Sequence, residues 1–172
     1  MILPYHERTN HVMELMLDEM ANTRDVLPRG GHLVLAIIRE GTTTTSKKFC
    51  EKGANLIEAR RRYQKFRAPS LKVNVMLKST LIARFLDLGV KQATDLGDEE
   101  VCPIHLLLGL AADENPDLAV IMKSFNITDP VAFYQNLVKD YLEKKNYQKT
   151  LVELRARIAH LEGFLRDRNL TP

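Results

Sequence analysis

Two histidines stand at equivalent places in the chain, and histidine is the residue type most often used for acid–base chemistry and metal ligation near neutral pH. His32 and His105 each begin a strongly apolar run, which covers residues 33–38 in one case and 106–110 in the other. A histidine at the start of an apolar helix can also satisfy local backbone groups. We favour this structural interpretation for both histidines.

The other residues capable of chemistry are scattered. His6 and His11 are five apart, one residue beyond the spacing that would aim both at one ion, and no nearby carboxylate pair completes a metal site. Cys50 and Cys102 form no CxxC, and neither shows an obvious His or Lys environment of the kind that a reactive thiol needs. Ser79 lies at a predicted helix start, where capping explains it better than nucleophilic chemistry. We therefore expect no catalytic residues, no metal and no cofactor, and we predict that the protein is not an enzyme.

The strongest positive feature is a basic cluster near the middle of the chain. Its members are Arg60, Arg61, Arg62, Lys65 and Arg67. Such a cluster could receive nucleic acid or an acidic partner. Alternatively, it is the solvated face of a helix, with its later members near the carboxyl end. No aromatic residues are interleaved to stack on bases, so we favour the second interpretation and consider nucleic-acid binding unlikely to be the function.

Composition narrows the class of protein. The 172 residues are 45% hydrophobic and 27% charged, with a net charge of +3, which does not by itself drive binding to nucleic acid or membranes. A cysteine count of two, with no CxxC and no ligand-like spacing, suggests a reducing compartment. The first residues lack a signal-peptide core, and the longest apolar run, 33–38, is too short to span a bilayer. We expect a soluble cytoplasmic protein; the alternative is a processed plastid stromal protein.

The chain contains an internal duplication. Residues 6–56 align without gaps to residues 73 positions later, which places His32 on His105 and Leu15 on Leu88. Each copy predicts a helix, a loop, a buried helix, a short helix and a polar helix, at 12–20, 32–39, 46–52 and 55–66 in the first copy. No segment alternates convincingly as a strand. The fold class is therefore predicted to be all-α, with two pseudo-symmetric four-helix repeats.

A long helix follows the duplication. Asp129 and Pro130 form a strong helix start, an N-cap acceptor followed by proline at the first helical position. We predict a double-repeat domain at 1–130, with repeat one at 5–67 and repeat two at 73–140 including the start of the last helix, and a C-terminal extension at 131–172. A short heptad pattern, named here the C-terminal seam, consists of Tyr147, Leu151, Leu154, Ile158, Leu161 and Leu165. The seam is expected either to fold back on the repeats or to pair with another copy or a partner.

These motifs resemble the Clp amino-terminal domain, also called the Clp repeat. Residues 5–9, which read YHERT, resemble the aromatic-Thr-Glu-Arg-Ala opening of that family. Residues 31–41 read GHLVLAIIREG, which is similar to the family signature EHLLLGLLREG, and residues 104–110 read IHLLLGL, a second copy. The resemblance covers about residues 5–140. The resemblance implies a fold of eight helices in two halves. In the family, this domain precedes the ATPase rings of Clp unfoldases and receives adaptors and marked substrates. It also occurs in proteins that have no ATPase.

The departures from the family pattern carry a further implication. In members that bind arginine-phosphorylated substrates, a glutamate precedes each signature histidine; Gly31 and Ile104 occupy those positions here, and His6 and Ser79 match the accompanying threonines. Losing both carboxylates removes the charge-assisted contact that a guanidinium group needs. We expect no appreciable phosphoarginine binding.

The resulting hypothesis is a non-catalytic protein-binding module, an accessory, adaptor or ligand-sequestering protein of a Clp protease system. The expected partners are Clp protease or Clp ATPase subunits or their substrates, together with a homo-oligomer through the C-terminal helix. The predicted partner or peptide groove is lined by His6, Val12, Gly31, Ser79, Phe85 and Ile104. Because the sequence has no GxxxxGK[ST] phosphate loop, we expect a stand-alone member. The alternatives are the substrate-receiving N-terminal part of a Clp ATPase and a basic helical nucleic-acid-binding protein.

Overall fold

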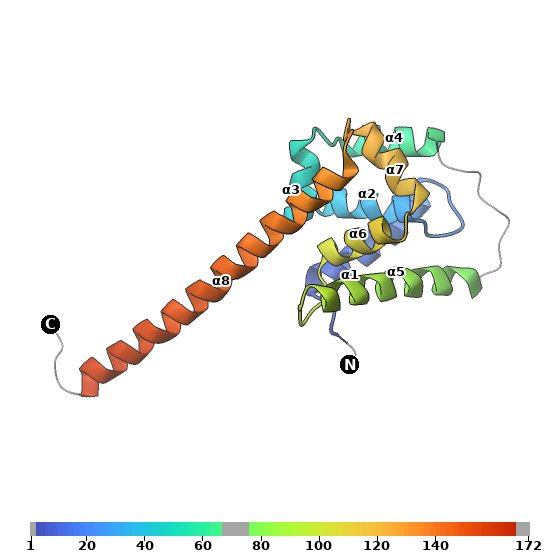
Figure 1. Ribbon diagram of the computed structural model, residues 1–172. Helices are drawn as coiled ribbons and strands as arrows, with labels where there is room; N and C mark the ends of the chain where they lie inside the picture. Colours follow the sequence, from blue (N-terminus) through green and yellow to red (C-terminus); the bar gives the residue numbers. More distant parts are fainter. Residues whose placement is uncertain (1–2, 67–75, 168–172) are drawn as a thin grey trace. The chain divides into compact units, whose positions relative to one another are not determined.

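The computed structural model describes residues 3–66 and 76–167, and within these two ranges the chain is helical throughout its regular structure (Figure 1). The helices are α1 (Glu7–Asn22), α2 (Gly30–Glu40), α3 (Thr44–Glu51), α4 (Leu56–Phe66), α5 (Met76–Asp95), α6 (Pro103–Ala112), α7 (Pro116–Ser124) and α8 (Pro130–Asp167). The described ranges contain no strand, only an isolated bridge between Tyr5 and Val101. The predicted all-α fold is confirmed.

The helix boundaries repeat along the chain. α2 begins at Gly30 and α6 at Pro103, 73 residues later, and α3 and α7 follow with nearly the same offset. α1 corresponds to α5, and α4 corresponds to the first turns of α8. The predicted pair of pseudo-symmetric four-helix repeats is therefore confirmed.

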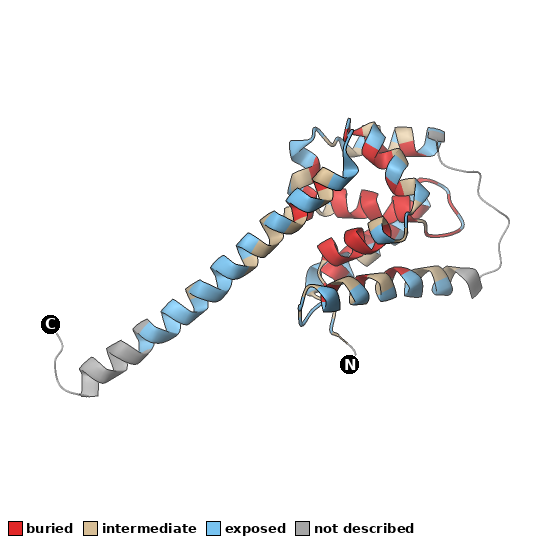
Figure 2. Ribbon diagram, viewed as in Figure 1, coloured by how far each residue is buried: buried red, intermediate tan, exposed pale blue. Residues whose placement is uncertain are grey.

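The core is built around α2 and α6, whose residues are apolar on nearly every side. Figure 2 shows both helices buried along almost their whole length, and Leu33, Leu35, Leu106 and Leu107 have no exposed surface. A helix that is apolar all round is stable only when other elements surround it. α1 packs on α2, α5 packs on α6, and each central helix also contacts the third helix of the other half, α2 with α7 and α6 with α3. The two repeats thus share one core.

Local sequence signals set many of the helix ends. The Asp129 carboxylate accepts a hydrogen bond from the backbone N–H of Ala132 at 2.9 Å, as the predicted N-cap requires. Asn115 caps α7 in the same way ahead of Pro116, accepting from the N–H of Asp117 at 3.2 Å. These caps begin α7 and α8 where the sequence indicates.

The residues that follow three helices of each half take up a left-handed conformation. The pairs at equivalent positions are Arg24 (φ 56°) and Gly97 (φ 65°), Gly41 (φ 74°) and Glu114 (φ 50°), and Gly53 (φ 77°) and Asn126 (φ 56°). Left-handed residues commonly terminate helices, and glycine adopts this conformation without steric cost. The same turn geometry therefore recurs in both halves although only one member of each pair is glycine.

The chain divides into two compact units, residues 1–134 and 135–172. The first contains α1 to α7 and the opening turns of α8, where Phe133 packs on Phe49 of α3 with ring centroids 5.1 Å apart. The second contains the rest of α8, in which Tyr147, Val152 and Leu154 are exposed. Among the described helices, none combines the length and the apolar character needed to cross a bilayer.

Candidate partner-binding surface

The two signature histidines cap the central helices. The Nδ1 atom of His32 accepts a hydrogen bond from the backbone N–H of Arg29 at 3.0 Å, and that of His105 accepts from the N–H of Cys102 at 2.9 Å. Each imidazole therefore satisfies a backbone donor at the start of its own helix, one of the groups that helix geometry leaves without a partner. The structural interpretation of both histidines is confirmed.

The second ring nitrogen of each histidine contacts an aspartate. His32 Nε2 lies 2.9 Å from Asp25 Oδ2, and His105 Nε2 lies 3.0 Å from Asp98 Oδ2. Because Nδ1 accepts a hydrogen bond, the ring proton is assigned to Nε2, which donates toward the carboxylate. Sequence reasoning missed both aspartates, although each stands seven residues before its histidine and thus follows the duplication.

Burial keeps His32 neutral. Its side chain has no exposed surface, and Nε2 also lies 2.8 Å from the hydroxyl of Thr23. Desolvation lowers the pKa of His32 to about 4, although the carboxylates of Asp117 and Glu19 act in the opposite direction. At neutral pH this histidine is an uncharged structural group with no access to a substrate. In the described ranges, no three His, Cys, Asp or Glu side chains gather in a way that could hold a metal ion.

Four of the six predicted groove residues lie inside the protein. Val12 has no exposed surface, Phe85 and Ile104 are 4% and 3% exposed, and Gly31 is buried. The side chains of Val12, Phe85 and Ile104 fill the shared core and do not reach a partner in this conformation. Gly31 leaves no open space beside it: a Cβ at this position would lie 2.1 Å from Cε2 of Tyr63, so the tyrosine ring already fills the space.

Tyr63 and Asp117 close the surface over Gly31. The Tyr63 hydroxyl donates to Asp117 Oδ2 at 3.2 Å, and the Gly31 backbone N–H donates to the same oxygen at 3.3 Å. Burial, followed by the negative charge of Asp117, raises the pKa of Tyr63 far above its ordinary value. A carboxylate of the chain itself thus occupies the amino end of α2, the place where the positive end of the helix dipole favours an anion.

The other two predicted groove residues remain near solvent. His6 is half-buried and caps α1, its Nδ1 accepting from the N–H of Arg8 at 3.1 Å. Ser79 is exposed on α5. A groove that uses these two residues stays a prediction.

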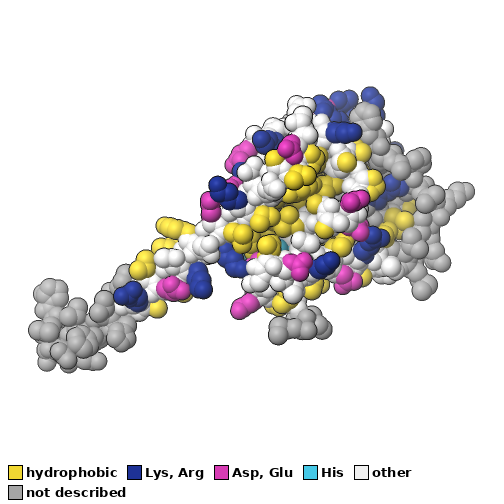
Figure 3. All heavy atoms as spheres, viewed as in Figure 1, with side chains coloured by type: hydrophobic (Ala, Val, Ile, Leu, Met, Phe, Trp, Pro, Cys, Tyr) yellow, Lys and Arg dark blue, Asp and Glu magenta, His cyan; other side chains and the backbone are white. Residues whose placement is uncertain are grey.

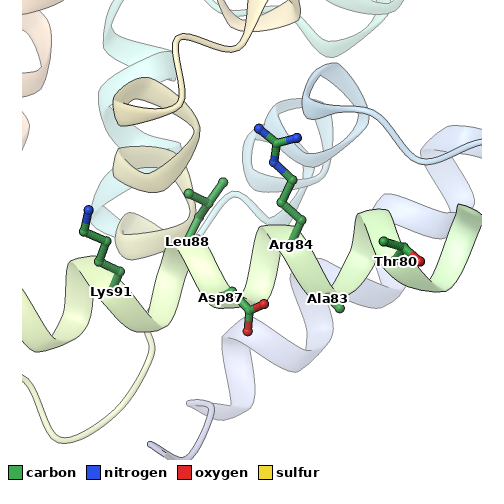
Figure 4. A pocket seen from close by; sticks show the side chains of 6 residues that line it. All are labelled: Thr80, Ala83, Arg84, Asp87, Leu88 and Lys91. Carbon is green, nitrogen blue, oxygen red and sulfur yellow. The ribbon is translucent and has the colours of Figure 1, made fainter.

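A hollow of about 410 Å³ lies along α5, next to Ser79 (Figure 4). All of its lining residues belong to this helix: Thr80, Ala83, Arg84, Asp87, Leu88 and Lys91. Figure 4 shows Arg84, Leu88 and Lys91 projecting from the same side of the helix. The guanidinium of Arg84 donates to the Asp113 carboxylate at 2.6 Å, which holds this cation beside the hollow. The lining of the hollow thus combines the apolar Ala83 and Leu88 with the charged Arg84, Asp87 and Lys91.

The predicted basic cluster is largely neutralised by carboxylates. Arg60 forms a two-pronged ion pair with Glu19, whose side chain is fully buried, with Nε 2.6 Å from Oε2. Arg61 and Arg62 both bind Glu58, and their hydrogen bonds lower its pKa to about 2. Lys65 is exposed, and Arg67 lies outside the described residues. The described part of the cluster is better suited to joining helices than to tracking a phosphate backbone.

Comparison with solved structures decides what this architecture is. The N-terminal domain of the caseinolytic protease associated chaperone ClpD from Arabidopsis thaliana superposes with a TM-score of 0.63 over 82% of this chain and 97% of that domain, at 16% sequence identity. The protein has a Clp-N-like fold. A second solved structure, from an investigation of a malarial protein secretion system, matches with a TM-score of 0.55 at 21% identity, covering 86% of this chain and 97% of the other. No protein-family model and no curated protein matches the sequence.

The Clp-N-like fold accounts for the arrangement of the site residues. Both signature histidines open the central helices of the two halves, and the suspected family likeness of the sequence is confirmed at the level of fold.

Proposed function

We propose that this protein is a non-catalytic protein-binding module that serves a Clp protease system as an accessory, adaptor or ligand-sequestering protein. The observation that carries the proposal is the Clp-N-like fold, shared with the N-terminal domain of a chaperone associated with caseinolytic protease. The partners proposed are Clp ATPase or protease subunits, or the substrates delivered to them.

We place the docking surface on α5, around the hollow and the neighbouring Ser79. Its exposed residues Ala83 and Lys91 can be changed without disturbing the core. The apolar Ala83 and Leu88 would give a partner buried area, and the charged residues beside them would give the polar rim that protein–protein interfaces have.

The test uses the full chain as bait for Clp subunits, followed by a direct binding measurement with the purified ATPase. Ala83→Glu places a charged side chain in the hollow and is expected to weaken binding at least tenfold, about the loss of one interface contact. Asn10→Glu is the matched control, because Asn10 is exposed at the equivalent position of α1. Failure of the wild-type chain to bind any Clp subunit, or equal weakening by both variants, would contradict the proposal.

A second candidate is the substrate-receiving N-terminal part of a Clp ATPase. The observation that favours it is that the ClpD structure is itself an N-terminal domain. A reading frame that continues downstream into a GxxxxGK[ST] motif would support this candidate over the accessory protein.

A further inference from the structure

The second unit of the chain presents an apolar face along an exposed helix. α8 runs unbroken to Asp167, so the alternating steps of four and three residues in the C-terminal seam place Tyr147, Leu151 and Leu154 on one side of it. Tyr147 is 66% exposed and Leu154 is 47% exposed. Figure 3 shows apolar side chains along this helix, interspersed with charged ones. Exposed apolar residues repeated at heptad spacing indicate a helix–helix interface.

We propose that the occupant of this face is the same face of a second copy, in a parallel two-stranded coiled coil centred on Leu154 and Ile158. In heptad terms, Leu151, Ile158 and Leu165 take the a positions, and Tyr147, Leu154 and Leu161 take the d positions. At the centre of the seam, the β-branched Ile158 at a lies between Leu154 and Leu161 at d, and a β-branched residue at a with leucine at d is typical of parallel dimers. Most of the stability of a helix in a protein comes from packing of its apolar face, and pairing supplies the burial that this face lacks.

Charge determines the orientation. Arg157 occupies a g position and Glu162 the e position five residues later, which are the two positions that meet across a parallel dimer. The dimer therefore gains this attractive pair twice. An antiparallel pairing of all six layers would be centred near residue 156, and would bring Arg155 and Arg157 close to their own copies. Like charges at this distance disfavour that arrangement.

The ends of the seam limit its strength. Lys144 occupies the a position before Tyr147, so two ammonium groups would meet there and the apolar layers stop. Gly163 lies at an f position, on the side away from the partner, where it lowers helix propensity without opening the interface. About three heptads of contact must offset the entropy of association, and we expect a dissociation constant in the micromolar range. The dimer would join two Clp-N-like units, whichever partner those units bind.

Sedimentation equilibrium of the full chain tests the proposal. We expect a monomer–dimer equilibrium, and Leu154→Glu should raise the dissociation constant at least about a hundredfold, because it removes two buried leucines. Val152→Glu is the matched control: Val152 is equally apolar and 65% exposed, but it lies off the seam at a b position, and its substitution should leave dimerisation unchanged. A chain that stays monomeric throughout the micromolar range overturns the proposal, as does an equal effect of both variants.

Charge reversal tests the parallel orientation. Arg157→Glu should weaken the dimer about fivefold to tenfold by placing two acidic residues together, and adding Glu162→Arg should restore it. Both positions lie outside the repeat domain, so unit 1–134 can report independently that the variants are folded. A dimer that Arg157→Glu strengthens or leaves unchanged, or that the double variant fails to restore, would show that the two helices do not run parallel in this register.

Discussion

Among the described glycines, Gly31 is the one at which an added Cβ would have the least room. A methyl group at its Cα would lie 2.1 Å from Tyr63 Cε2, well inside contact distance. Gly31→Ala is therefore expected to destabilise the protein by about 2 kcal/mol, the usual cost of overpacking a core. Urea unfolding measures the change.

A double-mutant cycle identifies the cause of that loss. If the tyrosine ring is responsible, Gly31→Ala should cost much less in a Tyr63→Leu background, because the shorter side chain leaves room for the methyl group. Strictly additive effects would mean that the ring is not the obstacle.

His32 should make stability depend on pH. Its pKa falls from 6.5 to about 4 on folding, so the unfolded chain binds more protons between these values and stability must decrease as the pH falls through this window. The loss by pH 4 is about 3 kcal/mol relative to pH 7, from a shift of this size in a fully buried group. Urea unfolding at pH 7, 6, 5 and 4 measures the loss.

The matched control for this pH dependence is His11→Gln, which removes an exposed imidazole in place of a buried one. In His32→Asn the slope between pH 6.5 and 5 should become shallower. A wild-type stability that does not change over that interval would contradict the assignment of His32 as a buried neutral group.

Among the elements, the helix ends show how the duplicated halves differ. Glu114 takes the left-handed conformation at φ 50° after α6, while its equivalent after α2 is Gly41 at φ 74°. A side chain in this region is strained by about 1 kcal/mol. Glu114→Gly should therefore stabilise the protein by about that amount, and Gly41→Ala should destabilise it similarly; thermal and urea unfolding report both.

The reciprocal pair is its own control, because both positions are exposed and neither change touches the core. If Glu114→Gly left the stability unchanged or lowered it, the Glu114 side chain would contribute at least as much as the backbone strain costs.

At the scale of the whole molecule, the Clp-N-like fold of this protein has no open site at the start of α2. Tyr63 and the Asp117 carboxylate occupy the place next to Gly31, and Ile104 is buried in the equivalent place of the other half. We expect the protein not to bind phosphoarginine, since the Asp117 carboxylate beside Gly31 is already bound by the Tyr63 hydroxyl and the Gly31 N–H, and Ile104 offers no carboxylate to a guanidinium.

Calorimetric titration of the full chain with phosphoarginine checks this expectation, with arginine and inorganic phosphate titrated in parallel to detect general ion binding. A micromolar dissociation constant for phosphoarginine would contradict it. Binding of phosphate alone would instead indicate an anion site unrelated to the guanidinium.

The sequence by itself determined the features that depend on neighbours along the chain. Helical periodicity predicted an all-α fold, the constant offset predicted two like halves, and Asp129 predicted the start of α8, because each of these reports only local backbone geometry. The capping role of His32 also follows from its place at the beginning of an apolar helix.

The tertiary structure alone decided which side chains meet across the fold. The sequence predicted a groove at Val12 and Phe85, yet packing buried both, and Arg60 was placed in a basic cluster, yet it binds the buried carboxylate of Glu19. Contacts between residues far apart in the chain depend on how shapes and charges fill a shared core, and a local pattern does not specify that filling. The same reason explains why no local pattern in the sequence indicated that the Tyr63 ring packs against Gly31.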